Sequence, residues 1–435
     1  MIRRGTRLYP MQAGCHILVS GRWDNNVAVV DLKRALDPAN DATSNAIINR
    51  VRVTPDLDVD GVADTPASGQ PVSIAIPRTG RYAYVVNHSG RATPAAAAAF
   101  QHGHPGIVTV LDLVAALDPA NNGTTAAMAD LIPTGMAGPV GIAMTPDDKF
   151  VLVTSAEAAE REDGGREVAV IDVTTRSVVR RIPLAVRTNG SAAPEPSPHP
   201  GPHPTFGHFP DPNGVAVSPL GPGYAFTANG GTDDVSVIDL KRALTGDPCA
   251  EIARVPVETG PFGLAVSPDG RLLAAASRES ARTGIEGRTI SLIDIARAAA
   301  GRADAELARV PVGSDDTNAA TRPFAVAFTR DGKHILATCF RSNTVSLVDI
   351  EKALAGLPAE VARLALEAPG GGPSRPRGVV MTPDGRHAAI TGGAKTGSGS
   401  SLLFLVDVKT MALAGRVTAV GNESYLLDIL PGPRA

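Results

Sequence analysis

Aromatic residues and cysteines are scarce in this sequence of 435 residues, and each shortage narrows what the chain can be. Aromatic residues make up 4% of it, with a single tryptophan, so a core must be built from aliphatic side chains. The cysteines Cys15, Cys249 and Cys339 are odd in number and far apart, and no C-x-x-C pair occurs. Neither a disulfide framework nor a zinc–thiolate site is therefore indicated.

An excess of basic charge and long apolar runs are also missing. The formal net charge is −3, so we expect no nucleic-acid partner. No apolar run reaches the roughly 18 residues of a membrane-spanning helix, so we expect no membrane span. The segment MIRRGTRLYPMQAG has a basic start but no apolar centre, so no signal peptide is visible. We expect a cytoplasmic protein or one whose leader has been removed.

Several catalytic and cofactor motifs are absent from the sequence. It contains no Walker A motif, no Rossmann glycine pattern and no G-x-S-x-G elbow. It also lacks a C-x-x-C-H segment, so we expect neither a nucleotide nor a covalent haem.

A short phrase ending in aspartate, V-x-V-[IVL]-D-[LIV] in form, occurs seven times. Its copies end at Asp31, Asp112, Asp172, Asp239, Asp294, Asp349 and Asp407. Intervals of 55 to 81 residues separate them. Repeats of this length that are rich in short strands are typical of a β-propeller. We predict an all-β, seven-bladed β-propeller that forms one domain over residues 1–435.

One repeat shows how a blade is built. Residues 261–266, 271–276, 289–294 and 305–312 are four short apolar segments, and the turn Ser267-Pro-Asp-Gly270 joins the first two. This arrangement predicts a four-stranded antiparallel blade. The repeated aspartates are followed by short helix-forming segments, so we interpret them as N-caps with a structural role.

The ends of the chain complete each other in this scheme. No inner strand precedes the first aspartate phrase, whereas residues 423–432 align with residues 260–269. We predict that the C-terminal strand completes the N-terminal blade and so closes the ring without free sheet edges.

The phrases Tyr224-Ala-Phe-Thr-Ala-Asn229 and Val235-Ser-Val-Ile-Asp239, with the turn Ser267-Pro-Asp-Gly270, resemble the YVTN family of bacterial β-propeller repeats. The resemblance covers about residues 14 to 432. It implies the propeller fold and favours a periplasmic location, because the family is often exported. It does not imply one activity, because related propellers include lactonases, dehydrogenase subunits and scaffold proteins.

Two long insertions depart from the repeat, at residues 87–106 and 187–212. In a propeller, both would lie on the face that carries the second-to-third-strand loops and the crossovers between blades, which we call the top face. Six of the nine histidines fall in these insertions: His88, His102, His104, His199, His203 and His208. Imidazole is a common transition-metal ligand, and Met136 in a neighbouring crossover would add a soft ligand for copper.

The histidines leave two interpretations open. They predict a metal site for copper, or for zinc or iron, that draws on both insertions. The alternative is a pair of solvated loops without any ligand, because no H-E-x-x-H or two-histidine-one-carboxylate spacing occurs.

A second candidate site lies where the inner strands begin. Arg322, Arg375 and Arg377 come from adjacent blades, and with Tyr425 they predict a binding site for an anionic ligand. The alternative is solvated charge at the rim. Asp428 stands where the other blades have alanine or valine, so it is either paired with a rim arginine or has a raised pKa.

Three functions follow from these sites. The first is a propeller that binds a transition metal and acts on a small anionic molecule. The second is a non-catalytic propeller that binds a protein partner on its top face. The third is a metal-independent lactonase or isomerase at the channel mouth that uses Asp428 as its catalytic residue. We expect a monomer in each case.

Overall fold

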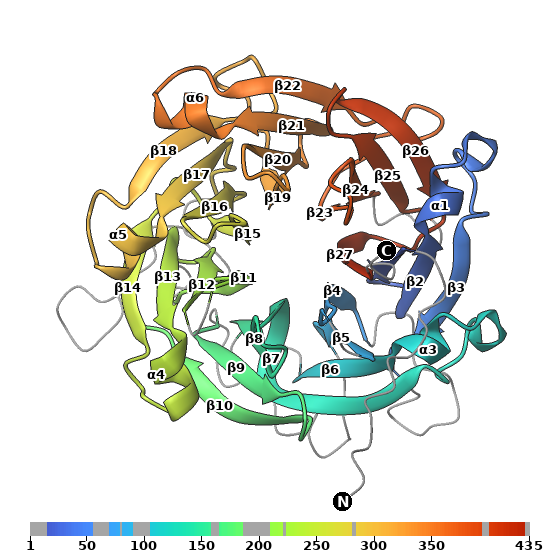
Figure 1. Ribbon diagram of the computed structural model, residues 1–435, viewed down its shortest axis with the longest axis horizontal. Helices are drawn as coiled ribbons and strands as arrows, with labels where there is room; N and C mark the ends of the chain where they lie inside the picture. The colour runs from blue at the N-terminus through green and yellow to red at the C-terminus, as the bar shows by residue number, and fades with distance from the viewer. Residues whose placement is uncertain are drawn as a thin grey trace, which may run out of the picture.

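The computed structural model describes residues 15–54, 69–78, 81–89, 105–157, 165–185, 209–220, 223–280, 284–393 and 400–430. In these residues the chain forms small antiparallel sheets arranged as a ring around a central axis (Figure 1). Each sheet runs outwards from the axis, so its inner strand faces the centre of the ring (Figure 1). The predicted all-β propeller is therefore confirmed. No helix in the described ranges is long and apolar enough to cross a membrane.

Five sheets contain four strands each, and we call them blades 1 and 4 to 7. Blade 1 consists of β27 (Ser424–Leu430), β1 (His16–Gly21), β2 (Asn26–Asp31) and β3 (Ile47–Arg52). Blade 4 consists of β11 (Pro212–Val217), β12 (Tyr224–Asn229), β13 (Asp234–Asp239) and β14 (Glu251–Pro256). Blade 5 consists of β15 (Pro261–Val266), β16 (Leu272–Ser277), β17 (Thr289–Asp294) and β18 (Glu306–Pro311). Blade 6 consists of β19 (Pro323–Phe328), β20 (His334–Cys339), β21 (Thr344–Asp349) and β22 (Glu360–Ala365). Blade 7 consists of β23 (Val379–Met381), β24 (His387–Gly392), β25 (Leu402–Asp407) and β26 (Ala412–Thr418).

The remaining sheet has seven strands because one long strand belongs to two blades. Its strands are β4 (Pro71–Ala75), β5 (Tyr82–Asn87), β6 (Pro105–Asp112), β7 (Met128–Met144), β8 (Phe150–Glu157), β9 (Glu167–Asp172) and β10 (Ser177–Pro183). The first part of β7, up to Ala137, pairs with β6, and the part from Ala137 onwards pairs with β8. Divided at Ala137, the sheet consists of blades 2 and 3, each with four strands.

The C-terminal strand closes the ring. Strand β27 pairs antiparallel with β1, with Ile17 opposite Ile429 and Leu18 opposite Asp428. It occupies the inner position of the blade whose other strands come from the N-terminal end of the described chain (Figure 1). The predicted closure by residues near the C-terminus is therefore confirmed.

The repeated aspartates cap the turns that follow the third strands. Asp31, for example, accepts a hydrogen bond from the amide of Arg34 at 2.9 Å, and Asp407 accepts one from Thr410 at 2.8 Å. Five of these turns are short α-helices: α1 (Leu32–Ala35), α3 (Leu113–Ala116), α4 (Leu240–Thr245), α5 (Ile295–Ala299) and α6 (Ile350–Leu354). Two 3-10 helices follow α1 and α3: η1 (Pro38–Asn40) and η2 (Pro119–Asn121). A carboxylate at the N-cap satisfies amides that have no partner inside the helix, so the role is structural.

Adjacent blades pack face to face through aliphatic side chains. Ile290 and Leu292 of β17 lie in one buried cluster with Ile335 and Ala337 of β20. The middle strands are buried on both faces, so most of their residues are apolar on both sides.

The inner strands approach one another very closely near their first residues. A Cβ atom on Gly141 would lie 2.3 Å from the carbonyl oxygen of Asn213, and one on Gly214 would lie 2.2 Å from that of Phe262. The hydroxyl of Thr154 also donates a hydrogen bond to the Asn213 carbonyl at 2.6 Å. These contacts fix the inner strands of neighbouring blades relative to each other, and with them the residues around the channel mouth.

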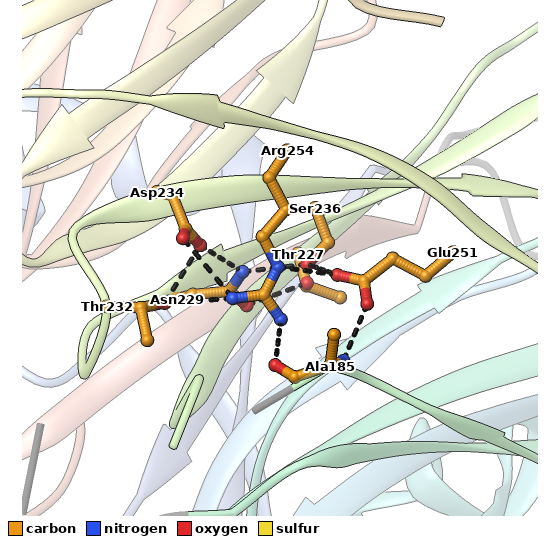
Figure 2. A network of polar contacts seen from close by, with 8 residues as sticks. All are labelled: Ala185, Thr227, Asn229, Thr232, Asp234, Ser236, Glu251 and Arg254. Carbon is orange, nitrogen blue, oxygen red and sulfur yellow. Dashed lines mark hydrogen bonds and ion pairs between the residues drawn. The ribbon is translucent and has the colours of Figure 1, made fainter. Parts of the chain in front are cut away.

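Polar networks hold the outer strands of blades 4 and 5. In blade 4, Glu251 accepts hydrogen bonds from Ser236 at 2.6 Å and from Arg254 at 2.8 Å. Glu306 repeats this with Ser291 and Arg309 in blade 5. Figure 2 shows the blade 4 network, in which Glu251 and Arg254 also bond the backbone of Ala185, at the end of blade 3. The network therefore joins blade 4 to the chain that arrives from blade 3.

Candidate functional site

The floor of the channel mouth is built from one register position of the inner strands. The second residue of the inner strand, or its equivalent in blade 7, is Val72, Val140, Asn213, Phe262, Phe324, Arg377 or Tyr425. The ring centroids of Phe262 and Phe324 are 4.4 Å apart, and those of Phe324 and Tyr425 are 5.5 Å apart. Val140 packs in the same cluster. One side of the mouth therefore has an aromatic floor, although aromatic residues are rare in the chain.

The rim of the mouth has a left-handed backbone in every blade. Two positions before each floor residue, φ is positive: Gln70 49°, Gly138 49°, Asp211 50°, Gly260 32°, Arg322 55°, Arg375 44° and Glu423 53°. This conformation favours glycine and costs other residues on the order of 1 kcal/mol. Five blades nevertheless keep a polar or charged side chain there. Strain of this kind is concentrated at binding and catalytic sites in proteins.

The structure brings the three predicted arginines together around one aromatic ring. The guanidinium carbons of Arg322, Arg375 and Arg377 lie 5.4, 5.8 and 5.0 Å from the ring centroid of Phe340. Arg377 also lies 5.1 Å from the ring of Tyr425. These separations are typical of cation–π contacts, so the arginines and the tyrosine form one cluster. Their role in ligand binding stays a prediction.

Two of these arginines already have carboxylate partners. Arg377 is 2% exposed and pairs with Glu423 at 3.1 Å. Arg322 pairs with Glu286 at 3.0 Å and with Glu279. Among the described residues, the exposed Arg375 side chain has no carboxylate partner. Carboxylates of the rim therefore neutralise much of the positive charge of the predicted arginines.

Arg278 is the residue at the mouth that sequence reasoning missed. It follows β16 directly, and its guanidinium lies 5.0 Å from the ring of Phe262 and 5.2 Å from that of Phe324. Its Nε is buried without an acceptor, and no described residue hydrogen-bonds or ion-pairs with the guanidinium. A half-buried guanidinium without an anion is available to bind one. Its position in the sequence could have indicated its place, because residues that directly follow the second strand of a blade lie at the mouth, as the first residues of the inner strands do.

Asp211 supplies a carboxyl group within electrostatic range of Arg278. Burial and, to a smaller extent, the negative charge of Glu157 raise the pKa of Asp211 to about 7, although the positive charge of Arg278 acts in the opposite direction. No described residue donates a hydrogen bond to the Asp211 carboxylate. A carboxyl group with a pKa near neutrality can both accept and return a proton at neutral pH, as a general base must.

Glu157 stands between Asp211 and one of the predicted metal ligands. Its carboxylate lies 3.2 Å from Nε2 of His88, and Nδ1 of that histidine lies 3.3 Å from the carbonyl oxygen of Pro139. A Cβ atom on Gly138 would lie 2.6 Å from the Glu157 side chain. Blade 3 therefore has glycine at the rim, and the glutamate side chain occupies the space beside it.

The predicted metal site is not tested by the structure. His102, His104, His199, His203 and His208 lie outside the described residues, as do most of both insertions. The part of the chain that is described contains no group of three or more metal-binding side chains. Met136 lies within β7 and not in a loop, and its buried side chain packs with Tyr84 and Ile132. Binding of copper, zinc or iron therefore stays a prediction.

Asp428 does not meet the rim arginines. Its carboxylate accepts hydrogen bonds at 2.8 Å from the amides of Ile76 and Ile429, in the lower part of the channel. Burial raises the pKa of Asp428 to about 6, as one of the two sequence interpretations required. Its predicted catalytic role is untested, but its distance along β27 from the rim separates it from the arginine cluster.

Comparisons with solved structures support the fold. The periplasmic gluconolactonase PpgL of Pseudomonas aeruginosa is 16% identical and superimposes with a TM-score of 0.62, over 96% of this chain and 100% of that one. A functionally unknown protein from Desulfotomaculum acetoxidans is 13% identical, with a TM-score of 0.59 over 96% and 99% of the two chains. Hydrazine synthase of Kuenenia stuttgartiensis is 20% identical, with a TM-score of 0.54 over 81% and 80%.

Neither a protein-family model nor a curated protein sequence matches the chain. The resemblance to YVTN repeats is thus supported at the level of the propeller fold, and membership of that family stays a prediction.

Proposed function

We propose that the channel mouth is the active site of a metal-independent hydrolase that opens a small anionic lactone. The observation that carries this proposal is the guanidinium of Arg278, which forms no hydrogen bond or ion pair with a described residue and lies over the rings of Phe262 and Phe324. Asp211 lies within its electrostatic range. An anion-binding group and a general base thus lie at the same channel mouth, beside an aromatic floor.

The charge of the mouth suits an anionic substrate. Arg22 and Arg377 share the single carboxylate of Glu423, at 3.8 and 3.1 Å, while Arg278 and Arg375 add positive charge. Arg322 and Arg341 are balanced by Glu279 and Glu286. Around Glu423 the guanidinium groups therefore outnumber the carboxylate, so this side of the mouth favours an anion over a neutral molecule.

The proposed reaction needs one base and one cation. Asp211, as carboxylate, takes a proton from water, and the hydroxide adds to the lactone carbonyl carbon. Arg278 donates hydrogen bonds to the oxyanion that develops on the carbonyl oxygen. The ring C–O bond then breaks, and the carboxylic acid of Asp211 returns its proton to the leaving alkoxide. The product is a hydroxy acid whose new carboxylic acid group releases its proton to solvent and stays beside Arg278 as a carboxylate.

The fold is compatible with this chemistry. PpgL, which shares the architecture, is a gluconolactonase, and at 16% identity it supports the proposal through its fold alone. The location and the substrate of PpgL are not carried over to this chain.

Hydrolysis of a panel of neutral and carboxylated lactones tests the proposal. Asp211→Asn should lower kcat by about 10²-fold or more, because it removes the base. Arg278→Met should lower kcat for anionic and neutral lactones alike, because both form the oxyanion that Arg278 contacts. In the wild type, kcat/KM should rise with pH through about 7, where Asp211 loses its proton. Asp304→Asn, a change in an exposed pair with Arg302, serves as control. Unchanged hydrolysis by Asp211→Asn would exclude this mechanism.

A second candidate function is transition-metal binding by the histidines of the top face. It is supported by His88, which reaches Glu157 at the mouth. Metal analysis of protein purified without an affinity tag, after exposure to copper, zinc and iron, tests it. His88→Ala should lower the bound metal, and His334→Ala, in β20, should not. Absence of both metal and lactone hydrolysis would leave the protein-binding propeller as the proposal to pursue.

A further inference from the structure

A cavity of about 310 Å³ lies below the aromatic floor, between the inner strands, and we call it the channel cavity. Its apolar lining includes Ile74, Ile142, Val215, Leu264, Val326 and Leu427, which come from different inner strands. Its volume is at the lower end of the range for small-molecule pockets. The cavity is therefore large enough for a small organic molecule.

Asp428 is the only charged side chain among the described residues that line the channel cavity. The other blades have small apolar residues at its register position: Ala75, Ala143, Ala216, Ala265, Ala327 and Val380. The repeat therefore folds without a carboxylate at this place. Blade 1 therefore differs from the other blades in having an aspartate at this position, and the propeller fold does not require it.

The carboxylate of Asp428 keeps part of its capacity to accept hydrogen bonds. Each oxygen accepts one backbone amide, from Ile76 and from Ile429, and a carboxylate has about four acceptor sites. No arginine, lysine or histidine lines the described part of the cavity. The negative charge thus has two amide dipoles nearby and no cation.

The strand edges add further acceptors. Strands β4, β11, β15, β19, β23 and β27 each end a sheet, so one edge of each has no neighbouring strand. These edges surround the centre of the ring (Figure 1). Backbone carbonyls on such an edge accept hydrogen bonds from whatever occupies the space beside it. The cavity therefore offers one negative charge, several carbonyl acceptors and aliphatic walls.

We propose that the channel cavity binds a small alkylammonium ion, with the ammonium group on Asp428 and the alkyl group against the aliphatic walls. The ammonium N–H groups are donors, and they match the acceptors of the cavity. This site is distinct from the mouth, because its lining includes Phe262 of the floor but neither Arg278 nor Asp211. Ile76 and Met144, at the other end of the inner strands, also line the cavity, so the ligand enters from the lower face.

Isothermal titration calorimetry with three probes of similar shape tests the proposal. Cyclohexylammonium should bind to the wild-type protein, while cyclohexanol and cyclohexanecarboxylate should bind at least tenfold more weakly. Asp428→Ala should weaken cyclohexylammonium binding about tenfold or more, because it removes a charge-assisted bond. That variant copies the residue of five other blades, so it should fold, and circular dichroism checks this. Binding by the wild type should also weaken as pH falls below about 6, where Asp428 gains a proton.

A rescue variant separates charge from structure. Ala143 lines the same cavity from blade 3, so Ala143→Asp in the Asp428→Ala background should restore most of the affinity. A merely structural role for Asp428, through the amide of Ile76, would not be rescued from another blade. Equal binding of the three probes, undiminished binding by Asp428→Ala or failure of the rescue would each overturn the proposal. So would the absence of cyclohexylammonium binding at about 10 mM.

Discussion

Arg377 and Glu423 form an ion pair, with 3.1 Å between Nη2 and Oε1, where blade 7 meets the C-terminal strand. The arginine is 2% exposed and also donates to the carbonyl oxygen of Gly393 at 2.6 Å. Glu423 is held in turn by the indole of Trp23. One pair thus links the floor and the rim of the mouth with the segment that closes the ring.

Replacing Arg377 by alanine should destabilise the protein by about 3 kcal/mol, because it leaves Glu423 without its buried partner. Arg375→Ala is the matched control two positions away. Its side chain is exposed and has no described carboxylate partner, so its effect should stay within about 0.5 kcal/mol. Urea unfolding followed by circular dichroism measures both values. Equal effects of the two variants would contradict the importance given to the pair.

Removing the closing strand should be far more damaging. Deletion of residues 423–435 removes β27 and exposes the edge of β1, so we expect aggregation or a large fall in melting temperature. Deletion of residues 431–435 leaves β27 whole and should change little. Size-exclusion chromatography and thermal unfolding compare the two truncations. If the longer deletion melts within a few degrees of the full chain, β27 does not hold the ring closed.

The raised pKa of Asp211 predicts a stability that depends on pH. The folded state holds the proton up to about pH 7, whereas an unfolded aspartate releases it near 3.8. The folded state therefore binds more protons between these values, and the free energy of unfolding falls as pH rises through this window. Asp211→Asn removes the effect, and asparagine tolerates the left-handed backbone equally well.

This variant should match the wild type near pH 4 and exceed its stability at pH 8, on the order of 2 kcal/mol. Denaturant unfolding at both values measures the difference. A difference that does not vary with pH would show that Asp211 titrates normally.

The polar networks of blades 4 and 5 allow a matched comparison of two glutamates. Glu251 and Glu306 both hold a serine and an arginine, but only Glu251 also accepts the Ala185 amide, at 2.6 Å. Glu251→Gln should therefore destabilise the protein by about 1 kcal/mol more than Glu306→Gln. Chemical denaturation gives both values. Equal losses would mean that the bond to Ala185 adds no stability.

The blades could be predicted from local sequence because each blade repeats the same pattern of strands and capped turns. The aspartate of each phrase caps the next turn, as Asp31 does for Arg34, and these contacts lie within three residues. The closing strand was also predictable, since residues 423–432 keep the pattern of an inner strand. What could not be predicted was strand β7, which continues through Met136. Whether a short crossover bends or stays extended depends on the strands beside it.

The candidate site could be predicted only where a charged residue occupies a position that recurs in every blade. Arg322, Arg375 and Arg377 precede or begin inner strands, so the repeat placed them at the mouth. Arg278 follows a second strand, and its lack of a partner depends on which carboxylates other blades supply. The pKa of Asp211 likewise depends on burial and on Glu157 from blade 3. Such properties arise from contacts between distant residues, which no local pattern contains.

The pairing of β27 with β1 has a consequence for synthesis on the ribosome. Strand β27, the inner partner of β1, is translated about 400 residues after β1. At about 5–20 residues per second, this delay is roughly 20 to 80 s. Throughout that interval the nascent chain carries an unpaired strand edge that other chains can join. Production of this protein thus depends on how well that edge is shielded until β27 has been synthesised.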